Sequence, residues 1–398
     1  MVIEAWKSYV SHNSGEYASF CAHYGTSGSN LFLIQFFLSA RLIAFRASDN
    51  LIDGNEYWLI VTAVYLPIFL EHCTLKSLKV RCYFGGMNRP IQNLGDGLTA
   101  HLLSGLGFEC VGPSNNDADL INPGRCLLAI GSLLAGEFLQ KFETSYDVWG
   151  TGFRGFNRWG LSDTDVVFHA VRGPHTAEEF RLPANTPLGD PGLLIPFIYP
   201  KPRELHGKSV VLPHFSRLDS PIARGMAASA GCDEQMASVT FTALDRCTHQ
   251  RLDLKGILTD LWQFREARTR NCASARSLID RIAGASFVLT GSLHGAILAQ
   301  AYGVPWAAFN DGFVDTPAKW DDWAAYLGVN FAFVRTLYEG REWWQECGRF
   351  GQIRDLRPLV EAFPYMDLSE KAQALAKRVD AMPHSHLKSL GSVRKMVV

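Results

Sequence analysis

The sequence predicts an α/β protein with two Rossmann-like halves. Short apolar segments alternate with helix-forming segments along most of the 398 residues, which is the pattern of a parallel sheet covered by helices. Glycine turns follow several apolar segments, as at Gly131 and Gly291. A stretch with three prolines and several charges, residues 196–208, interrupts the pattern and is the best linker. The expected parts are an N-terminal extension, a first half and a second half with C-terminal helices: 1–75, 76–200 and 201–398.

The first half begins with a strand and a helix. Val80 and Cys82 alternate with charged residues in 77–84, as in a half-buried strand. The following segment predicts a helix that Asp96 caps and Gly107 ends. The remaining expected elements are strands at 108–111, 126–132, 146–152 and 165–173 and a helix that starts at Pro174.

The second half repeats the alternation. Apolar residues recur on one side of 274–285, which predicts an amphipathic helix. The last helix starts at Asp367 or Ser369, either of which is a good cap. The other expected elements are strands at 208–215, 236–241, 286–292 and 304–310 and helices at 223–231 and 293–303.

Composition excludes some classes of function. The net charge of −1 provides no basic field for nucleic acid. The nine cysteines form no CxxC pair, so we expect reduced, mostly buried thiols in a cytoplasmic protein. Metal-ligand spacing is also missing from the sequence, so we expect no bound metal.

The first 75 residues differ from the rest. Their two apolar runs, 31–45 and 57–70, are shorter than the roughly 20 residues that span a bilayer. Neither run has the pattern of a signal peptide. The segment is interpreted as upstream sequence from a misplaced start, or as a helical extension that packs on the body or on a membrane surface. A transmembrane anchor is the least favoured interpretation.

The glycine turns are candidate ligand contacts. Ligands of parallel sheets bind beyond the carboxyl ends of the strands, and glycine lets the backbone approach them closely. The sequence has neither a GxGxxG fingerprint nor a GxxxxGK[ST] loop, which argues against dinucleotides and P-loop hydrolysis. Candidate residues at these turns are Gly131, Ser132, Gly150, Thr151, Gly152, Gly189, Asp190, His214 and Gly291.

Two side chains stand out beside these turns. Arg172 ends an apolar strand, where its guanidinium can bind a carboxylate or phosphate or can form a salt bridge across the domain. His294 opens an otherwise apolar helix, as a catalytic imidazole or as a structural one bonded to a neighbouring carbonyl. The residues alone leave both pairs of alternatives open.

From about residue 78 to 317 the chain resembles the polysaccharide pyruvyl transferase family, most closely its members in succinoglycan-type exopolysaccharide assembly. Six segments occur in the order and spacing of that family, which is far more specific than any one of them. They are NLGDGL (93–98), AIGSLL (129–134), VWGTGF (148–153), AVRGPHTAEEF (170–180), LGDPGLLIP (188–196) and GSLHGAILAQAYGVPW (291–306).

The resemblance implies a fold and a reaction. The fold is GT-B-like, with two Rossmann-like domains facing across a cleft. The reaction moves pyruvate from phosphoenolpyruvate to two hydroxyls of a sugar, forms a cyclic ketal and releases phosphate, without a metal or tightly bound cofactor. Arg172 matches the arginine that grips the donor, and we expect His294 to be the acid that protonates its methylene carbon.

The first and last segments extend this site. Asn93, Gly95 and Asp96 lie in the first segment, and Asp96 or His214 is the candidate base for the attacking hydroxyl. Many members of the family have Arg-Leu-His where this chain has Ser292-Leu293-His294, so one donor contact is missing. Helix-start N–H groups or another cation, such as Arg217, are candidates to replace it. Trp149, Phe153 and Trp306 are candidates to stack on a sugar, although core packing fits Trp306 better.

The expected partners are phosphoenolpyruvate and a sugar acceptor, most simply a lipid-linked oligosaccharide at the inner face of the cytoplasmic membrane. The main alternative is a GT-B-type nucleotide-sugar glycosyltransferase, because that architecture is shared. The other is a non-catalytic carbohydrate-binding protein, for which the serine at 292 is the best support.

Overall fold

The computed structural model describes most of the chain after residue 77. The described ranges are 78–83, 91–113, 119–139, 145–155, 165–217, 220–229, 234–235, 239–241 and 275–382. All of them belong to one compact unit, Ser77–Val398. The expected extension over 1–75 lies outside the described residues.

Five parallel strands form the sheet of the first half. They are β1 (Leu78–Arg81), β3 (Phe108–Val111), β4 (Arg125–Leu128), β5 (Ser145–Trp149) and β6 (Val166–Ala170). β1 pairs with β3, and β5 lies between β4 and β6. A parallel bridge between Cys82 and Leu127 joins the two groups. The resulting order, β3-β1-β4-β5-β6, is 2-1-3-4-5 when these strands are numbered along the chain.

The second half has a five-stranded parallel sheet with the same order. Its strands are β7 (Ser209–Leu212), β8 (Glu234–Gln235), β10 (Phe287–Thr290), β11 (Trp306–Phe309) and β12 (Phe333–Val334), arranged β12-β11-β10-β7-β8. In this topology ligands bind where the strand order reverses. The reversal lies between β7 and β10, which precede His214 and His294. The predicted α/β class with parallel sheets is confirmed.

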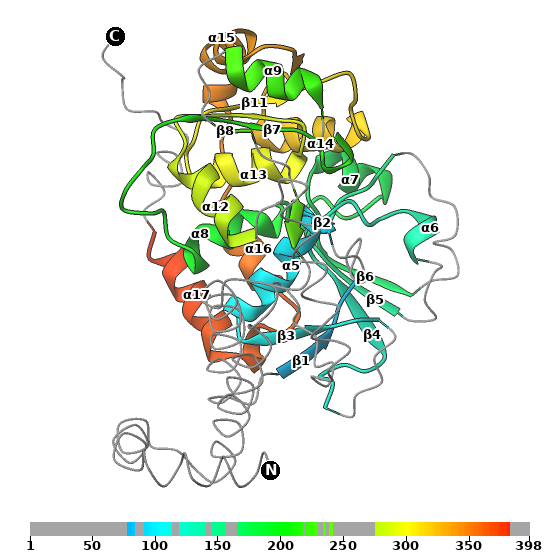
Figure 1. The fold of residues 1–398 in the computed structure, drawn as a ribbon. Coiled ribbons are helices and arrows are strands. Elements are labelled where there is room, and N and C mark those ends of the chain that lie inside the picture. Colours follow the sequence, from blue (N-terminus) through cyan, green and yellow to red (C-terminus); the bar gives the residue numbers. More distant parts are fainter. Residues whose placement is uncertain are drawn as a thin grey trace, which may run out of the picture. The chain divides into compact units, whose positions relative to one another are not determined.

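Helices connect and cover these strands (Figure 1). The α-helices are α5 (Leu94–Gly105), α6 (Gly136–Leu139), α7 (Pro174–Glu179), α8 (Ile195–Ile198), α9 (Pro221–Ser229), α12 (Ala275–Gly284), α13 (Leu293–Ala301), α14 (Pro317–Leu327), α15 (Leu337–Glu346), α16 (Arg357–Glu361) and α17 (Glu370–Asp380). Short 3₁₀ helices are η1 (Pro191–Leu194), η2 (Phe215–Arg217), η3 (Gly348–Phe350) and η4 (Met366–Leu368).

Two local expectations need correction. The side chain of Asn93 caps α5 by accepting from the Gly95 N–H, so Asp96 is the third residue of the helix and not its cap. The strand expected at 236–241 is β9 (Val239–Phe241), which pairs antiparallel with β2 (Ile91–Asn93) and not with the parallel sheet. Of the two caps predicted for the last helix, Ser369 is confirmed, because its side chain accepts from the Ala372 N–H.

The C-terminal helices return to the first half. Figure 1 shows α17 beside α5, and the Ser369 hydroxyl donates to the Leu106 carbonyl at the end of α5. Between α16 and α17, the Phe363 ring packs on Phe108 and Trp149. Trp149 is buried there and donates from Nε1 to the Leu359 carbonyl over 2.7 Å.

The three aromatic candidates for sugar stacking are all buried. Trp149, Phe153 and Trp306 are at most 2% exposed. Trp306 donates to the Gln300 side chain over 2.8 Å and contacts two further tryptophans of α15. These rings are therefore core residues in the structure, as the sequence favoured for Trp306 alone.

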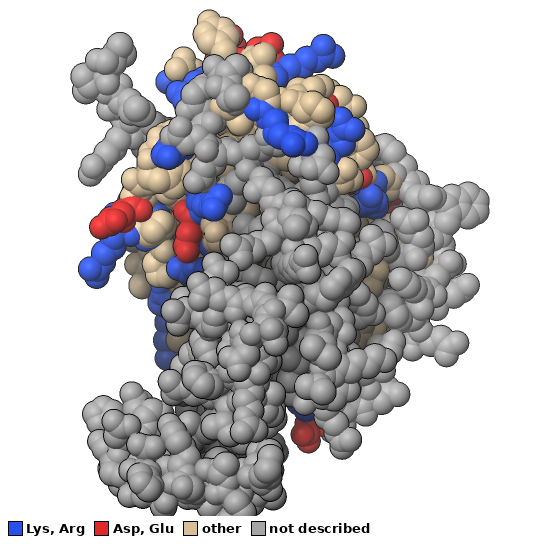
Figure 2. All heavy atoms as spheres, in the orientation of Figure 1, with Lys and Arg blue, Asp and Glu red and all other residues tan. Residues whose placement is uncertain are grey.

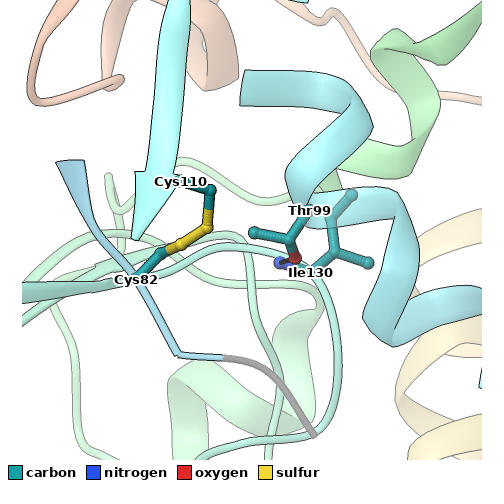
Figure 3. Close-up of a disulfide and its surroundings, with 4 residues drawn as sticks. All are labelled: Cys82, Thr99, Cys110 and Ile130. Atoms are coloured by element: carbon teal, nitrogen blue, oxygen red, sulfur yellow. Dashed lines mark hydrogen bonds between the residues drawn. A yellow bond between two sulfur atoms is a disulfide. The ribbon is translucent and has the colours of Figure 1, made fainter. Parts of the chain in front are cut away.

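A disulfide joins Cys82, which follows β1, to Cys110 in β3 (Figure 3). Close by, the Ile130 N–H donates to the Thr99 hydroxyl of α5. The prediction of reduced thiols is therefore wrong for this pair. Cys126 is a free, buried thiol, as expected.

The described surface carries both signs of charge. Figure 2 shows Lys and Arg side chains scattered over the described part of one face, with a few Asp and Glu side chains among them. Within the described ranges, none of the helices is long and apolar enough to span a bilayer.

Candidate active site

Arg172 follows β6 and is fully buried at the carboxyl end of the first sheet. Its Nη1 donates to the Ser132 hydroxyl over 2.7 Å and to the Gly131 carbonyl over 3.2 Å. Nη2 donates to the Phe153 carbonyl over 3.2 Å. The guanidinium therefore ties together the turns that follow β4 and β5. Three of the six family segments, 129–134, 148–153 and 170–180, meet at this side chain.

A buried carboxylate completes this arrangement from the second half. Asp322 of α14 accepts from Arg172 Nε over 3.1 Å. It also accepts from the N–H and the hydroxyl of Thr176 in α7, over 3.0 and 2.7 Å. We call Ser132, Arg172, Thr176 and Asp322 the Arg172 cluster. The sequence analysis gave two alternatives for Arg172, a salt bridge across the domain or contact with the donor. The ion pair with Asp322 is such a salt bridge. Contact with the donor stays a prediction.

The glycine turns make room for this cluster. A Cβ atom at Gly152 would overlap the Arg172 guanidinium. Gly131 and Gly150 have φ angles of 130° and 85°, a region that favours glycine. The Thr151 hydroxyl donates to the Gly131 carbonyl over 2.9 Å and accepts from the Leu133 N–H. These predicted site residues are thus brought together, and their observed contacts are with protein groups.

His294 is the second residue of α13, directly after β10. Its Nε2 lies 3.3 Å from Oδ2 of Asp190, which precedes η1. The other carboxylate oxygen of Asp190 accepts from the Gly192 N–H over 2.8 Å. A Cβ atom at Gly95 would overlap Nδ1 of the imidazole, so glycine lets α5 approach the ring. The remaining three family segments, 93–98, 188–196 and 291–306, therefore meet at His294.

Polar atoms around His294 are not fully bonded. Among the described residues, His294 Nε2, Asp190 Oδ2 and the Tyr326 hydroxyl are buried without a hydrogen-bond partner. The imidazole and carboxylate are within ion-pair distance, although their angle does not make a hydrogen bond. Burial raises the pKa of Tyr326 above its usual value, and the Asp190 charge adds to the rise. We call Gly95, Asp190, His294 and Tyr326 the His294 cluster.

Helix α14 supplies residues to both clusters, and the sequence reasoning missed it. Asp322 and Tyr326 are four residues apart, so they lie on one face of the helix. Lys319 lies on that face as well, three residues before Asp322. The available signal was this spacing of polar residues within an aromatic helix that follows a strand, WDDWAAY over 320–326.

A charged group lies beyond β7 and β11. Asp315 accepts from Lys319 Nζ over 2.5 Å and from Arg154 Nη2 over 3.0 Å. His214 Nε2 lies 3.7 Å from the same carboxylate. Burial, together with the nearby Lys319 charge, lowers the pKa of His214 to about 4. Burial opposes ionisation of Asp315, but Lys319 and Arg154 bring its pKa below the usual value.

The other predicted site residues have varied positions. Ser292 is the buried N-cap of α13 without a side-chain capping bond, and Leu293 is buried behind it. Arg217 is partly exposed, with Nε 3.6 Å from Asp311. Gly189 has a φ of 152°, and Gly291 lies against the backbone of His214. The side chain of Asp96 lies outside the described residues. No group of three or more metal-ligating side chains occurs in the part of the chain that the structure describes.

Comparison with known proteins gives one family. Residues 41–311 match the polysaccharide pyruvyl transferase family, so the match begins within 1–75 and ends before α14. The chain is 25% identical over 214 residues to succinoglycan biosynthesis protein ExoV of Rhizobium meliloti (strain 1021). That alignment spans 53% of this chain and 56% of the relative, so the chain matches about half of the relative's length. A crystal structure of an uncharacterized protein from Klebsiella pneumoniae is 17% identical, with a TM-score of 0.34, and the match covers 69% of this chain and 98% of that one.

Proposed function

Because the chain belongs to the polysaccharide pyruvyl transferase family, we propose that it moves pyruvate from phosphoenolpyruvate to two hydroxyls of a sugar. The product is a cyclic ketal, and phosphate is released. The observation that carries the proposal is the His294 cluster, in which three family segments place an imidazole beside a buried carboxylate. A buried ionisable pair with unsatisfied polar atoms is typical of functional sites.

His294 is the proposed acid. Its Nε2 lies 3.3 Å from Oδ2 of Asp190. The protonated ring gives a proton to the methylene carbon of the donor, and C2 gains oxocarbenium character. One sugar hydroxyl attacks C2, phosphate leaves with the C–O electron pair, and the second hydroxyl closes the ring. The two hydroxyl protons restore the imidazolium and protonate the phosphate, so the reaction balances.

The other predicted residues take supporting roles. The Arg172 guanidinium is bonded to Ser132, Phe153 and Asp322, so we assign it to holding the two halves around the site, with direct grip on the donor as the competing proposal. Burial lowers the pKa of His214 to about 4, close to the ordinary value of about 3.9 for an aspartate, so His214 and Asp96 stay alternative candidates to accept a hydroxyl proton.

The remaining parts of the proposal concern architecture and place. We expect the two parallel sheets to form a GT-B-like pair of domains across a cleft, without a metal or bound cofactor. The proposed acceptor is a lipid-linked oligosaccharide in exopolysaccharide assembly. Its proposed place is the cytoplasm, at the inner face of the membrane, where such acceptors are exposed.

The test supplies the full chain with phosphoenolpyruvate and a synthetic or lipid-linked oligosaccharide. We expect equal amounts of released phosphate and ketal, measured by a phosphate assay and by NMR of the ketal methyl group. Tight binding of a nucleotide diphosphate without ketal would instead favour a glycosyltransferase. Sugar binding without phosphate release would favour the non-catalytic alternative.

A further inference from the structure

The resemblance implies an arginine where this chain has Ser292, and cations from elsewhere in the chain converge at the same sheet edge. Thr290 of β10 pairs with Leu212 of β7 and with Ala308 of β11. The residues that follow these strands therefore lie side by side beyond one edge. They include Ser292 after β10, His214 after β7 and the loop that leads to Asp315 after β11.

Two cationic side chains meet at Asp315 from opposite halves of the chain. Arg154 comes from the loop after β5, and Lys319 from the first turn of α14. They contact the two oxygens of one carboxylate, over 3.0 and 2.5 Å. Lys319 is only 6% exposed, and burial lowers its pKa below the usual value against the pull of Asp315. An ammonium is rarely buried without a functional or ionic reason.

His214 adds an imidazole to this group. Nδ1 of His214 lies 2.8 Å from the Ser216 hydroxyl and accepts from the Ser216 N–H over 3.3 Å. Nε2 lies 3.7 Å from Asp315, which is longer than a hydrogen bond. Nε2 is therefore the ring nitrogen that lies toward the carboxylate that Arg154 and Lys319 share.

The backbone beside this group is strained. Thr316, between Asp315 and Pro317, has a φ of 47° and caps α14 without a side-chain hydrogen bond. A β-branched residue in the left-handed region costs of order 1–3 kcal/mol and tends to occur at functional sites. Thr316 therefore connects Asp315 to the helix that carries its partner Lys319.

We infer that Arg154, Lys319 and His214 form a binding site for the phosphate or carboxylate of an anionic donor, with Asp315 as the internal anion that the ligand displaces. This site takes the place of the arginine missing at Ser292. The inference rests on the proposed function for the identity of the donor, but binding of inorganic phosphate tests the site independently of turnover.

The experiment measures binding of inorganic phosphate and of phosphoenolpyruvate to the full chain by titration calorimetry. Arg154 is 38% exposed, so Arg154→Gln should leave the fold intact. We expect it to weaken both affinities by at least about tenfold, the usual effect of losing a charge-assisted hydrogen bond. Asp315→Asn removes the competing anion, so it should tighten phosphate binding. Arg349→Gln, at an exposed arginine in η3, is the matched control and should change nothing.

Phosphate binding within twofold of the unsubstituted chain in Arg154→Gln overturns the inference, as does unchanged or weaker binding in a folded Asp315→Asn variant. If ketal forms but Arg154→Gln leaves the KM for phosphoenolpyruvate unchanged, the site is wrong and the transferase proposal stands. If no ketal forms but both variants change phosphate binding as expected, the anion site is supported and the transferase proposal is wrong.

Discussion

Two buried pairs of a basic and an acidic side chain join segments that are far apart in the sequence: Arg172 with Asp322, and His294 with Asp190. In the Arg172 cluster, every nitrogen of the guanidinium donates to a protein group, and both carboxylate oxygens of Asp322 accept hydrogen bonds. In the His294 cluster, Nε2 of the imidazole and Oδ2 of the carboxylate are buried without a hydrogen bond among the described residues.

We propose that this difference separates a structural role for the Arg172 cluster from a catalytic role for the His294 cluster. A buried polar group without a partner costs about 1–3 kcal/mol, so it persists where something other than stability is selected. The Arg172 cluster has the bonding expected of a structural contact between the two halves. The His294 cluster keeps buried polar atoms without a hydrogen bond among the described residues, which agrees with the proton transfer that we propose there.

The largest expected effect is on the Arg172 cluster. Arg172→Ala should lower the free energy of unfolding by about 3–5 kcal/mol, because it leaves Asp322 buried without its cation. Denaturant unfolding followed by circular dichroism measures this. A variant as stable as the unsubstituted chain, but with a raised KM for phosphoenolpyruvate, would break the comparison and make Arg172 the donor grip.

The next effect is on catalysis. His294→Gln should lower kcat by at least about 10²-fold, because the amide fills a similar volume but cannot deliver a proton. Its unfolding free energy should change far less than that of Arg172→Ala. Phosphate release and calorimetric melting give the two readouts. Near-normal turnover would show that His294 is structural as well.

A smaller effect is expected at Thr176 of α7, where a substitution should change stability but not turnover. Thr176→Val removes the hydroxyl that donates to Asp322 and accepts from the Phe153 N–H. We expect a loss of about 2 kcal/mol in unfolding free energy, since the lost bond is to a charged group. Turnover of the folded variant at saturating substrate should be unchanged, and a reduced kcat would argue against a purely structural cluster.

The smallest effect is on the partner of the imidazole. Asp190→Asn should lower kcat by about tenfold, because the carboxylate that faces Nε2 of His294 no longer orients the ring. Phosphate release measures this change. An unchanged kcat with lower stability would place Asp190 in the fold and not in the reaction.

Much of the local structure was predictable. The strand at 108–111 agrees with β3, and Pro174, Gly107 and Ser369 lie at the expected helix boundaries. The cap of α5 was predicted three residues late because Asn93 and Asp96 are both good caps, and only the backbone geometry chooses between them. Strand β9 was predicted as a strand, but its partner, β2, is antiparallel and remote in sequence.

The amino-acid sequence by itself determined the alternation of strands and helices around the six family segments, the family, and the segments that supply His294 and Arg172. These follow from local periodicity and short motifs, which need no knowledge of distant residues. Only the tertiary structure decided that Arg172 pairs with Asp322, 150 positions away, and that Lys319, Asp322 and Tyr326 share one face of α14. Burial and pairing depend on which surfaces the folded chain brings together, and a linear pattern does not contain that information.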